Sequence, residues 1–170
     1  MKKSWLVLPF AAALWFSPAA QARNVTYHLD IQPVVNALVA EGKIDNSVKF
    51  YTEGQIAKER VVQAFREVSS RGRARTGLED TEIFSAERYT SGSRGKSVEE
   101  EDIENCTRAA RATLVRFHNA ARRHGANAVI GIESYFRRNR KGYSEPGKYE
   151  CHAGSGSVSV EMQGTVAIVR

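Results

Sequence analysis

The clearest pattern of apolar and polar positions lies between residues 98 and 124. Acidic side chains lie in the first turns of this segment and Arg122 and Arg123 in the last, as a helix dipole favours. Ser97 and Glu100 have capping-box spacing, and Gly125 follows the end. The pattern predicts a long helix with one narrow buried face. Apolar residues recur on that face at steps of three or four: Ile103, Cys106, Ala110, Leu114, Phe117 and Ala121.

Shorter patterned segments surround this helix. A short helix is expected to start near Ile31, after the capping residue Asp30, and to end at Gly42. Residues 61–69 fit either a helix or a strand and are assigned to a strand. In the last apolar segment, valines alternate with Ser and Glu, which predicts one wet face. Strands are predicted at 24–29, 48–51, 61–69, 126–136, 149–154 and 157–169.

These elements predict an α+β fold. A small, mostly antiparallel sheet is covered by one long and one short helix, and its C-terminal strands form a meander. Residues 70–97 are rich in glycine and basic side chains and poor in apolar ones, so we expect a mobile connection there within one domain spanning residues 23–170. Gly154, Gly156 and Gly164 indicate bulges or close approaches between strands.

The first 22 residues have the pattern of a signal peptide. Lys2 and Lys3 precede an apolar run that ends at Phe16, and Ala20-Gln21-Ala22 has the spacing of a cleavage site. Cleavage after Ala22 would release a periplasmic or secreted chain. Because the apolar run is too short for a comfortable transmembrane helix, and no later segment approaches that length, the chain is not expected to span a membrane.

Composition narrows the class of protein further. The chain has 170 residues, a formal charge of +6 and two cysteines, which excludes a disulfide-dense mini-protein and a Cys-rich zinc module. In an oxidising compartment, Cys106 and Cys151 are expected to form a disulfide, which would close a loop of roughly 45 residues and stabilise the fold by about 4 kcal/mol. Metal ligation, free thiols and an intermolecular bridge are the alternatives.

Motifs for catalysis are incomplete. Gly95-Lys96-Ser97 resembles the end of a phosphate-binding loop, but Thr90 stands where the first glycine is required. No G-x-S-x-G sequence is present, and Cys106 lies on the apolar stripe of the long helix. We therefore expect neither an enzyme nor a cofactor. Metal binding is a weak alternative, with Cys106, Cys151 and His152 as ligands and His28 close by in the sheet.

Two basic clusters are the candidate contact surface. The second is interleaved with Tyr135, Phe136 and Tyr143, a mixture that can bind nucleic acid or an anionic glycan, although a solvated loop face is the commoner origin of such a cluster. For an exported protein, an anionic lipid, a lipopolysaccharide or an acidic protein is a better partner than nucleic acid. The clusters are Arg71, Arg73 and Arg75, and Arg137, Arg138, Arg140 and Lys141.

Part of the chain resembles the YbjQ-like and RcsF-like fold family. The run Gly125-Ala126-Asn127-Ala128-Val129-Ile130-Gly131-Ile132 is similar to the family's helix-to-strand junction, and residues 164–169 are similar to its closing strand. The resemblance covers about residues 98–170. It implies a helix-to-sheet disulfide between Cys106 and Cys151, a heavy-metal-binding activity and assembly into a ring of identical subunits. Asn127 is expected to bond to the backbone at the junction.

The whole mature chain also resembles small exported bacterial proteins commonly labelled "excinuclease ATPase subunit". The similarity rests on residues 23–29, 47–51 and 150–154. The label implies a DNA-repair ATPase, which the incomplete phosphate-binding loop and the signal peptide disfavour. The sequence thus predicts an exported, non-enzymatic envelope protein with a disulfide-locked binding or sensing domain and a basic loop surface.

Overall fold

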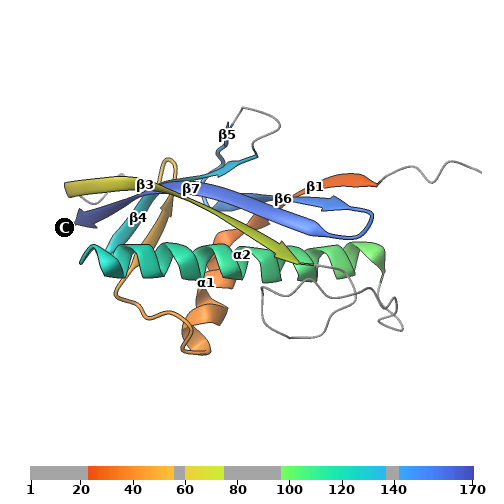
Figure 1. Cartoon of the computed structure of the whole chain (residues 1–170), viewed down its shortest axis with the longest axis horizontal. Coiled ribbons are helices and arrows are strands. Elements are labelled where there is room, and N and C mark those ends of the chain that lie inside the picture. The colour runs from red at the N-terminus through yellow and green to blue at the C-terminus, as the bar shows by residue number, and fades with distance from the viewer. Residues whose placement is uncertain (1–22, 56–59, 75–96, 137–141) are drawn as a thin grey trace, which may run out of the picture.

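The computed structural model describes residues 23–55, 60–74, 97–136 and 142–170. It has the predicted α+β architecture, with a curled, mostly antiparallel sheet on one side of two helices (Figure 1). Pairing between β2 and β4 is parallel, and the other strand pairs are antiparallel. In chain order the elements are β1 (Asn24–Asp30), α1 (Ile31–Ala40), β2 (Lys49–Thr52), β3 (Val61–Ala74), α2 (Val98–Arg123), β4 (Ala128–Tyr135), β5 (Gly142–Tyr143), β6 (Lys148–Gly154) and β7 (Val158–Val169).

Strand β7 organises the sheet. One of its edges pairs with β3 from Val158 to Val169, so β6 and β4 both pair with the other edge. On that edge β7 pairs with β6 near its start and with β4 from Met162 to Ala167. The predicted C-terminal meander is therefore wrong, because β7 lies between β6 and β4. Its 12 residues give it the length to pair with both in succession.

Strand β3 is longer than the sequence pattern predicted. The expected end at Ser69 is wrong, because the strand continues to Ala74 and takes the first residues of the predicted connection into the sheet. Gly72 lies where β3 meets α2: a Cβ atom there would fall 1.8 Å from the carbonyl oxygen of Ala109. A glycine at this position therefore permits the close approach of strand and helix. Residues 75–96 of the predicted connection lie outside the described residues.

The predicted start of α2 is confirmed, and its buried surface is wider than predicted. Ser97 Oγ accepts from Glu100 N at 3.2 Å, and the Glu100 carboxylate accepts from Ser97 N at 2.7 Å. The helix packs against the sheet and also against α1, so it buries polar residues outside the predicted apolar stripe. Those residues are Asp102, Asn105, Thr113 and His118.

Other local predictions have mixed outcomes. Asp30 precedes α1 as predicted, but its side chain makes no capping hydrogen bond. The expected wet face of β7 is wrong at Glu161, which is only 8% exposed and pairs with Arg71. Asn127 does bond to backbone, although to the last residue of β7: its Nδ2 donates to Val169 O at 2.9 Å and its Oδ1 accepts from Val169 N at 2.8 Å.

The core joins α2 to the sheet through the Cys106–Cys151 disulfide. Both cysteines are fully buried, and their Cα atoms are 5.8 Å apart. Around the bridge the core consists of alanines from α2, aliphatic residues from α1 and β7, and Tyr149 from β6. Among the described residues, no helix is both long and apolar enough to cross a membrane.

Candidate functional site: the basic end of the domain

Three elements terminate together at one end of the molecule. Strand β3 begins there, where α2 and β7 end (Figure 1). Arg60 N donates to Arg170 O at 2.8 Å and Arg170 N donates to Arg60 O at 3.0 Å, which extends the ladder between β3 and β7 by one residue pair. The ring of Phe65 in β3 stacks on His124 at the end of α2, with 5.5 Å between ring centroids. The start of β3 and the ends of α2 and β7 thus form one surface.

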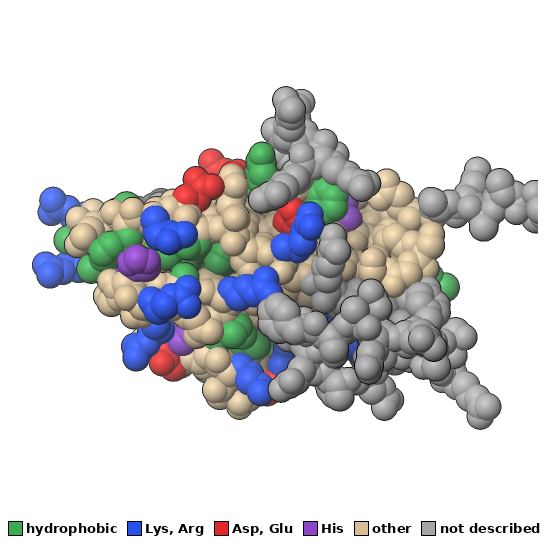
Figure 2. All heavy atoms as spheres, in the orientation of Figure 1, with side chains coloured by type: hydrophobic (Ala, Val, Ile, Leu, Met, Phe, Trp, Pro, Cys, Tyr) green, Lys and Arg blue, Asp and Glu red, His purple; other side chains and the backbone are tan. Residues whose placement is uncertain are grey.

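This surface is rich in arginine, and the exposed Glu67, next to Arg66 in β3, lies at its border. The three stretches that meet here, residues 60–66, 116–127 and 164–170, contain no Asp or Glu. Figure 2 shows Lys and Arg side chains projecting around an apolar strip and a histidine at this end. We call the surface the basic end and define it by its exposed arginines: Arg60, Arg66, Arg122, Arg123 and Arg170.

The pairing of Arg60 with Arg170 is electrostatically unfavourable in isolation. The reciprocal hydrogen bonds place the two residues directly opposite each other in an antiparallel pair, so both side chains leave the same face of the sheet. Like charges in this arrangement destabilise a sheet. An anion held between the two guanidinium groups would relieve the repulsion, because each group offers several N–H donors to oxygen.

Apolar side chains are exposed among these arginines. Val61 is 39% exposed and Val62 is 49% exposed, and Phe65 is half-buried against His124. The ladder shifts register between Val61 and Gln63, so Val62 is an extra residue of a bulge. Bulges re-aim side chains, which is consistent with both valines reaching solvent.

The loop between α1 and β2 carries an acid that contacts neighbours of the basic end. Asp45 Oδ1 accepts from Ser47 N at 2.9 Å and from the Ser47 hydroxyl, and lies 3.1 Å from His118 Nε2. These hydrogen bonds, led by that of the Ser47 side chain, hold the pKa of Asp45 well below its ordinary value. Arg122 Nη1 donates to Ser47 Oγ at 3.2 Å. The carboxylate of Asp45 is thus engaged by its own loop and by α2.

The same loop borders an open pocket of about 440 Å³, which does not have the geometry of a nucleophilic site. Val39, Lys43, Ile44 and His118 are among its lining residues. The Ser47 hydroxyl donates to Asp45, whereas an activated serine needs its hydroxyl on the base. The arrangement supports a structural role for His118, which ties the loop to α2.

The structure places only part of the predicted contact patch. The Arg71 side chain is 43% exposed, but it forms an ion pair with Glu161. The carbonyl oxygen of Arg71 accepts a hydrogen bond from Arg116 at 2.6 Å. Arg73 lies in β3 opposite Ser159. The other members lie outside the described residues: Arg75, Arg137, Arg138, Arg140 and Lys141. As a contact surface, that patch stays a prediction.

The predicted metal ligands do not converge. Cys106 and Cys151 form a disulfide, and a disulfide supplies no thiolate to a metal. His152 lies on the opposite face of β6 from Cys151, where its ring meets Phe136 and its Nδ1 lies 3.2 Å from Thr26 Oγ1. Within the described ranges, no group of three or more His, Cys, Asp or Glu residues is arranged to hold a metal ion.

His28 and His152 do approach each other through a shared carboxylate. His28 Nε2 lies 3.7 Å from one oxygen of Glu150, and His152 Nε2 lies 3.3 Å from the other. The ring of Tyr143 stacks on His28 with 4.2 Å between centroids. These contacts lie on the outer face of the sheet and hold β5 against β1 and β6. In the incomplete phosphate-binding motif, Ser97 caps α2, and Gly95 and Lys96 lie outside the described residues.

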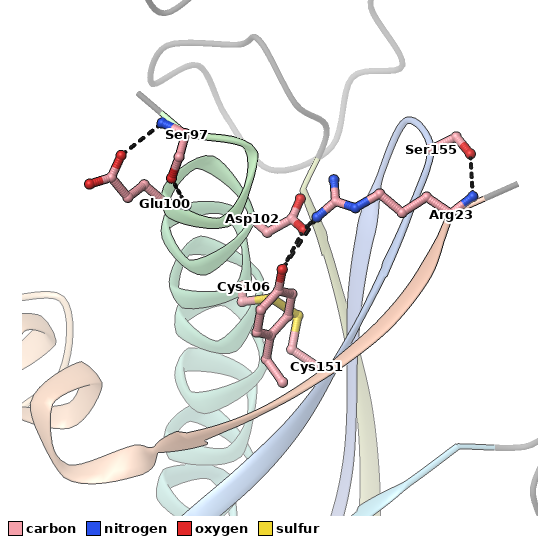
Figure 3. A network of polar contacts seen from close by, with 8 residues as sticks. Arg23, Ser97, Glu100, Asp102, Cys106, Cys151 and Ser155 are labelled. Atoms are coloured by element: carbon pink, nitrogen blue, oxygen red, sulfur yellow. Dashed lines mark hydrogen bonds and ion pairs between the residues drawn. A yellow bond between two sulfur atoms is a disulfide. The ribbon is translucent and has the colours of Figure 1, made fainter. Parts of the chain in front are cut away.

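A buried polar network beside the disulfide was missed by sequence reasoning. Asp102 is fully buried one turn before Cys106, accepts from the Tyr27 hydroxyl at 2.9 Å and forms an ion pair with Arg23 (Figure 3). Arg23 N also donates to Ser155 Oγ at 3.0 Å. This network fastens the first described residue of the chain to α2 and to the turn between β6 and β7.

The basic end was missed for a different reason. Its arginines come from stretches separated by tens of residues, and each stretch contributes only one or two of the five. A comparison of the chain with protein-family models, with curated proteins and with solved structures found no match.

Proposed function

We propose that this chain is an exported, non-enzymatic binding domain of the cell envelope that holds an anionic partner at its basic end. One observation carries the proposal: five exposed arginines gather where β3, α2 and β7 terminate, in stretches that contain no Asp or Glu. Two of them, Arg60 and Arg170, lie directly opposite each other. A surface of this kind attracts anions and repels cations, with a strength that falls as salt rises.

Export is supported by two independent features. Residues 1–22 have the order of a signal peptide, with a basic start, an apolar run and a small-residue cleavage site. The Cys106–Cys151 disulfide fits the same destination, because such bonds persist in the periplasm and outside the cell and are rare in the cytosol. In that setting, an envelope anion is a better partner than chromosomal DNA.

The finer fold assignment is also part of the proposal. The YbjQ-like and RcsF-like family is supported by the run from Gly125 to Ile132, which spans the end of α2 and the first half of β4. Gly125 and Gly131 both have positive φ, at 62° and 59°, which favours glycine at these positions of the run. The helix-to-sheet disulfide agrees with the same family.

Binding of a labelled polyphosphate tests the proposal. Fluorescence anisotropy on the full mature chain should show binding that weakens as sodium chloride is raised. A variant with Arg60→Gln, Arg123→Gln and Arg170→Gln should bind about tenfold more weakly at low salt, since each guanidinium–phosphate contact contributes roughly 0.5 kcal/mol or more at an exposed site.

A matched variant removes the same charge elsewhere. Arg137→Gln, Arg138→Gln and Arg140→Gln together lower the net charge by the same three units and remove most of the cluster that the sequence analysis predicted as the contact. If the basic end holds the anion, this variant binds polyphosphate nearly as tightly as the wild type. A loss confined to this second variant would overturn the location proposed here, and no binding by the wild type would overturn the proposed function.

A further inference from the structure

The basic end combines charge with exposed apolar surface, and the combination narrows the class of partner. A soluble polyanion gains nothing from a neighbouring valine. A membrane surface binds such a valine favourably, because its interfacial layer accepts apolar side chains beside the lipid phosphate groups. Val61 and Val62 have no role in the core: they are two of the three large hydrophobic residues exposed in the described part of the chain.

The position of the valines in the strand fits this role. They lie next to Arg60 and a few residues before Arg66, at the start of a strand that pairs only along its β7 edge within the described ranges. The bulge at Val62 and a second register shift between Ala64 and Glu67 interrupt the ladder. Bulges of this kind blunt a strand edge against pairing with another chain, so edge-to-edge association explains the exposed valines less well.

The arginines fit lipid headgroups. A guanidinium group binds phosphate through two parallel N–H donors, and the opposed pair Arg60 and Arg170 presents two such groups on one face. Arg123 contributes from the end of α2, next to His124 and its stacked partner Phe65. Anionic lipid would therefore offset the repulsion between the opposed guanidinium groups of Arg60 and Arg170.

We propose that the anionic partner is a membrane surface rich in anionic phospholipid, an inference that rests on the proposed function. The basic end docks on it end-on, with Val61 and Val62 in the headgroup layer and the arginines Arg60, Arg123 and Arg170 on the lipid phosphates. The domain is then a peripheral membrane protein. Its long axis, along α2, points away from the bilayer.

Vesicle flotation tests this inference with the full mature chain. The wild type should float with vesicles of phosphatidylcholine mixed with phosphatidylglycerol and should not float with phosphatidylcholine alone. The variant Val61→Ser/Val62→Ser should bind the anionic vesicles about tenfold more weakly, because partial insertion of two valines removes apolar area from water. The same variant should bind labelled polyphosphate as the wild type does.

Val98 supplies the matched control. It is 59% exposed at the first turn of α2, at the opposite end of that helix, so Val98→Ser removes an exposed valine without touching the basic end. This variant should float like the wild type. Equal flotation of Val61→Ser/Val62→Ser and the wild type would overturn the membrane inference.

The two proposals fail in distinguishable ways. Polyphosphate binding at the basic end without binding to anionic vesicles would overturn the membrane inference and leave the proposed function standing, with a soluble anion as the partner. Binding to neither would overturn both. Circular dichroism of each variant in the absence of ligand establishes that a loss of binding does not come from unfolding.

Discussion

Arg60 and Arg170 are bonded to each other through their backbones in both directions, at 2.8 and 3.0 Å, and carry like charges on one face of the sheet. This relationship has an energetic consequence that does not depend on any partner. Directly opposed like charges destabilise an antiparallel pair by roughly 0.2–1 kcal/mol. The two opposed charges therefore destabilise this end of the ladder between β3 and β7.

The first prediction concerns this repulsion. Arg60→Gln should raise the free energy of unfolding by about 0.5 kcal/mol at low ionic strength, because it removes one of two opposed charges. The gain should shrink when salt is added. Urea unfolding at low and high sodium chloride measures both effects. A loss of stability at low salt would contradict the description of the pair.

The second prediction concerns the disulfide. Replacing Cys106 and Cys151 by alanine should lower the free energy of unfolding by about 4 kcal/mol, since the bridge closes a loop with a sequence separation of 45 residues and restricts the unfolded chain. Reduction of the wild type should give a similar loss. Urea unfolding with and without reductant tests this, and unchanged stability after verified reduction would refute the role assigned to the bridge.

The third prediction concerns the buried carboxylate of Asp102. Arg23→Gln should lower the free energy of unfolding by about 3 kcal/mol, because it leaves the fully buried carboxylate of Asp102 with Tyr27 as its main partner. Adding Asp102→Asn should recover much of that loss by removing the charge. Thermal or urea unfolding of the single and double variants measures the coupling. Additive losses in the double variant would show that the two residues do not depend on each other.

The fourth prediction concerns alkaline pH. Burial raises the pKa of Tyr149 to about 12 from an ordinary value of 10. Between these values the unfolded chain loses the phenolic proton and the folded chain retains it, so stability falls as pH rises through that window, by up to about 3 kcal/mol. In Tyr149→Phe this component of the loss should be absent. Unfolding at pH 9 and 11 compares the two proteins, and identical losses would contradict the assignment.

Sequence reasoning succeeded where the signal is local. The helix cap of Ser97 and Glu100 and the turn at Gly125 involve residues close together in the chain, and the structure shows both. The Cys106–Cys151 bridge is long-range, but the chain contains only two cysteines, so the pairing within the molecule had one solution.

The rest depends on contacts that no local pattern encodes. The place of β7 between β6 and β4 follows from pairing along its whole length, which a list of strands does not contain. The interior position of Asp102 depends on Arg23 and Tyr27, far away in sequence. The basic end likewise exists only after β3, α2 and β7 are brought together. Clusters of basic residues along the sequence therefore predict a contact surface on loops instead.

The most direct test of the account is a nuclear magnetic resonance titration of the mature chain with polyphosphate, following backbone amide and arginine side-chain signals. The account predicts that the largest shifts fall on residues 60–66 and 122–124 and on Arg170, and that they disappear at high salt. Largest shifts in residues 142–148, or no shifts at saturating polyphosphate, would contradict the claim that the basic end is the binding surface.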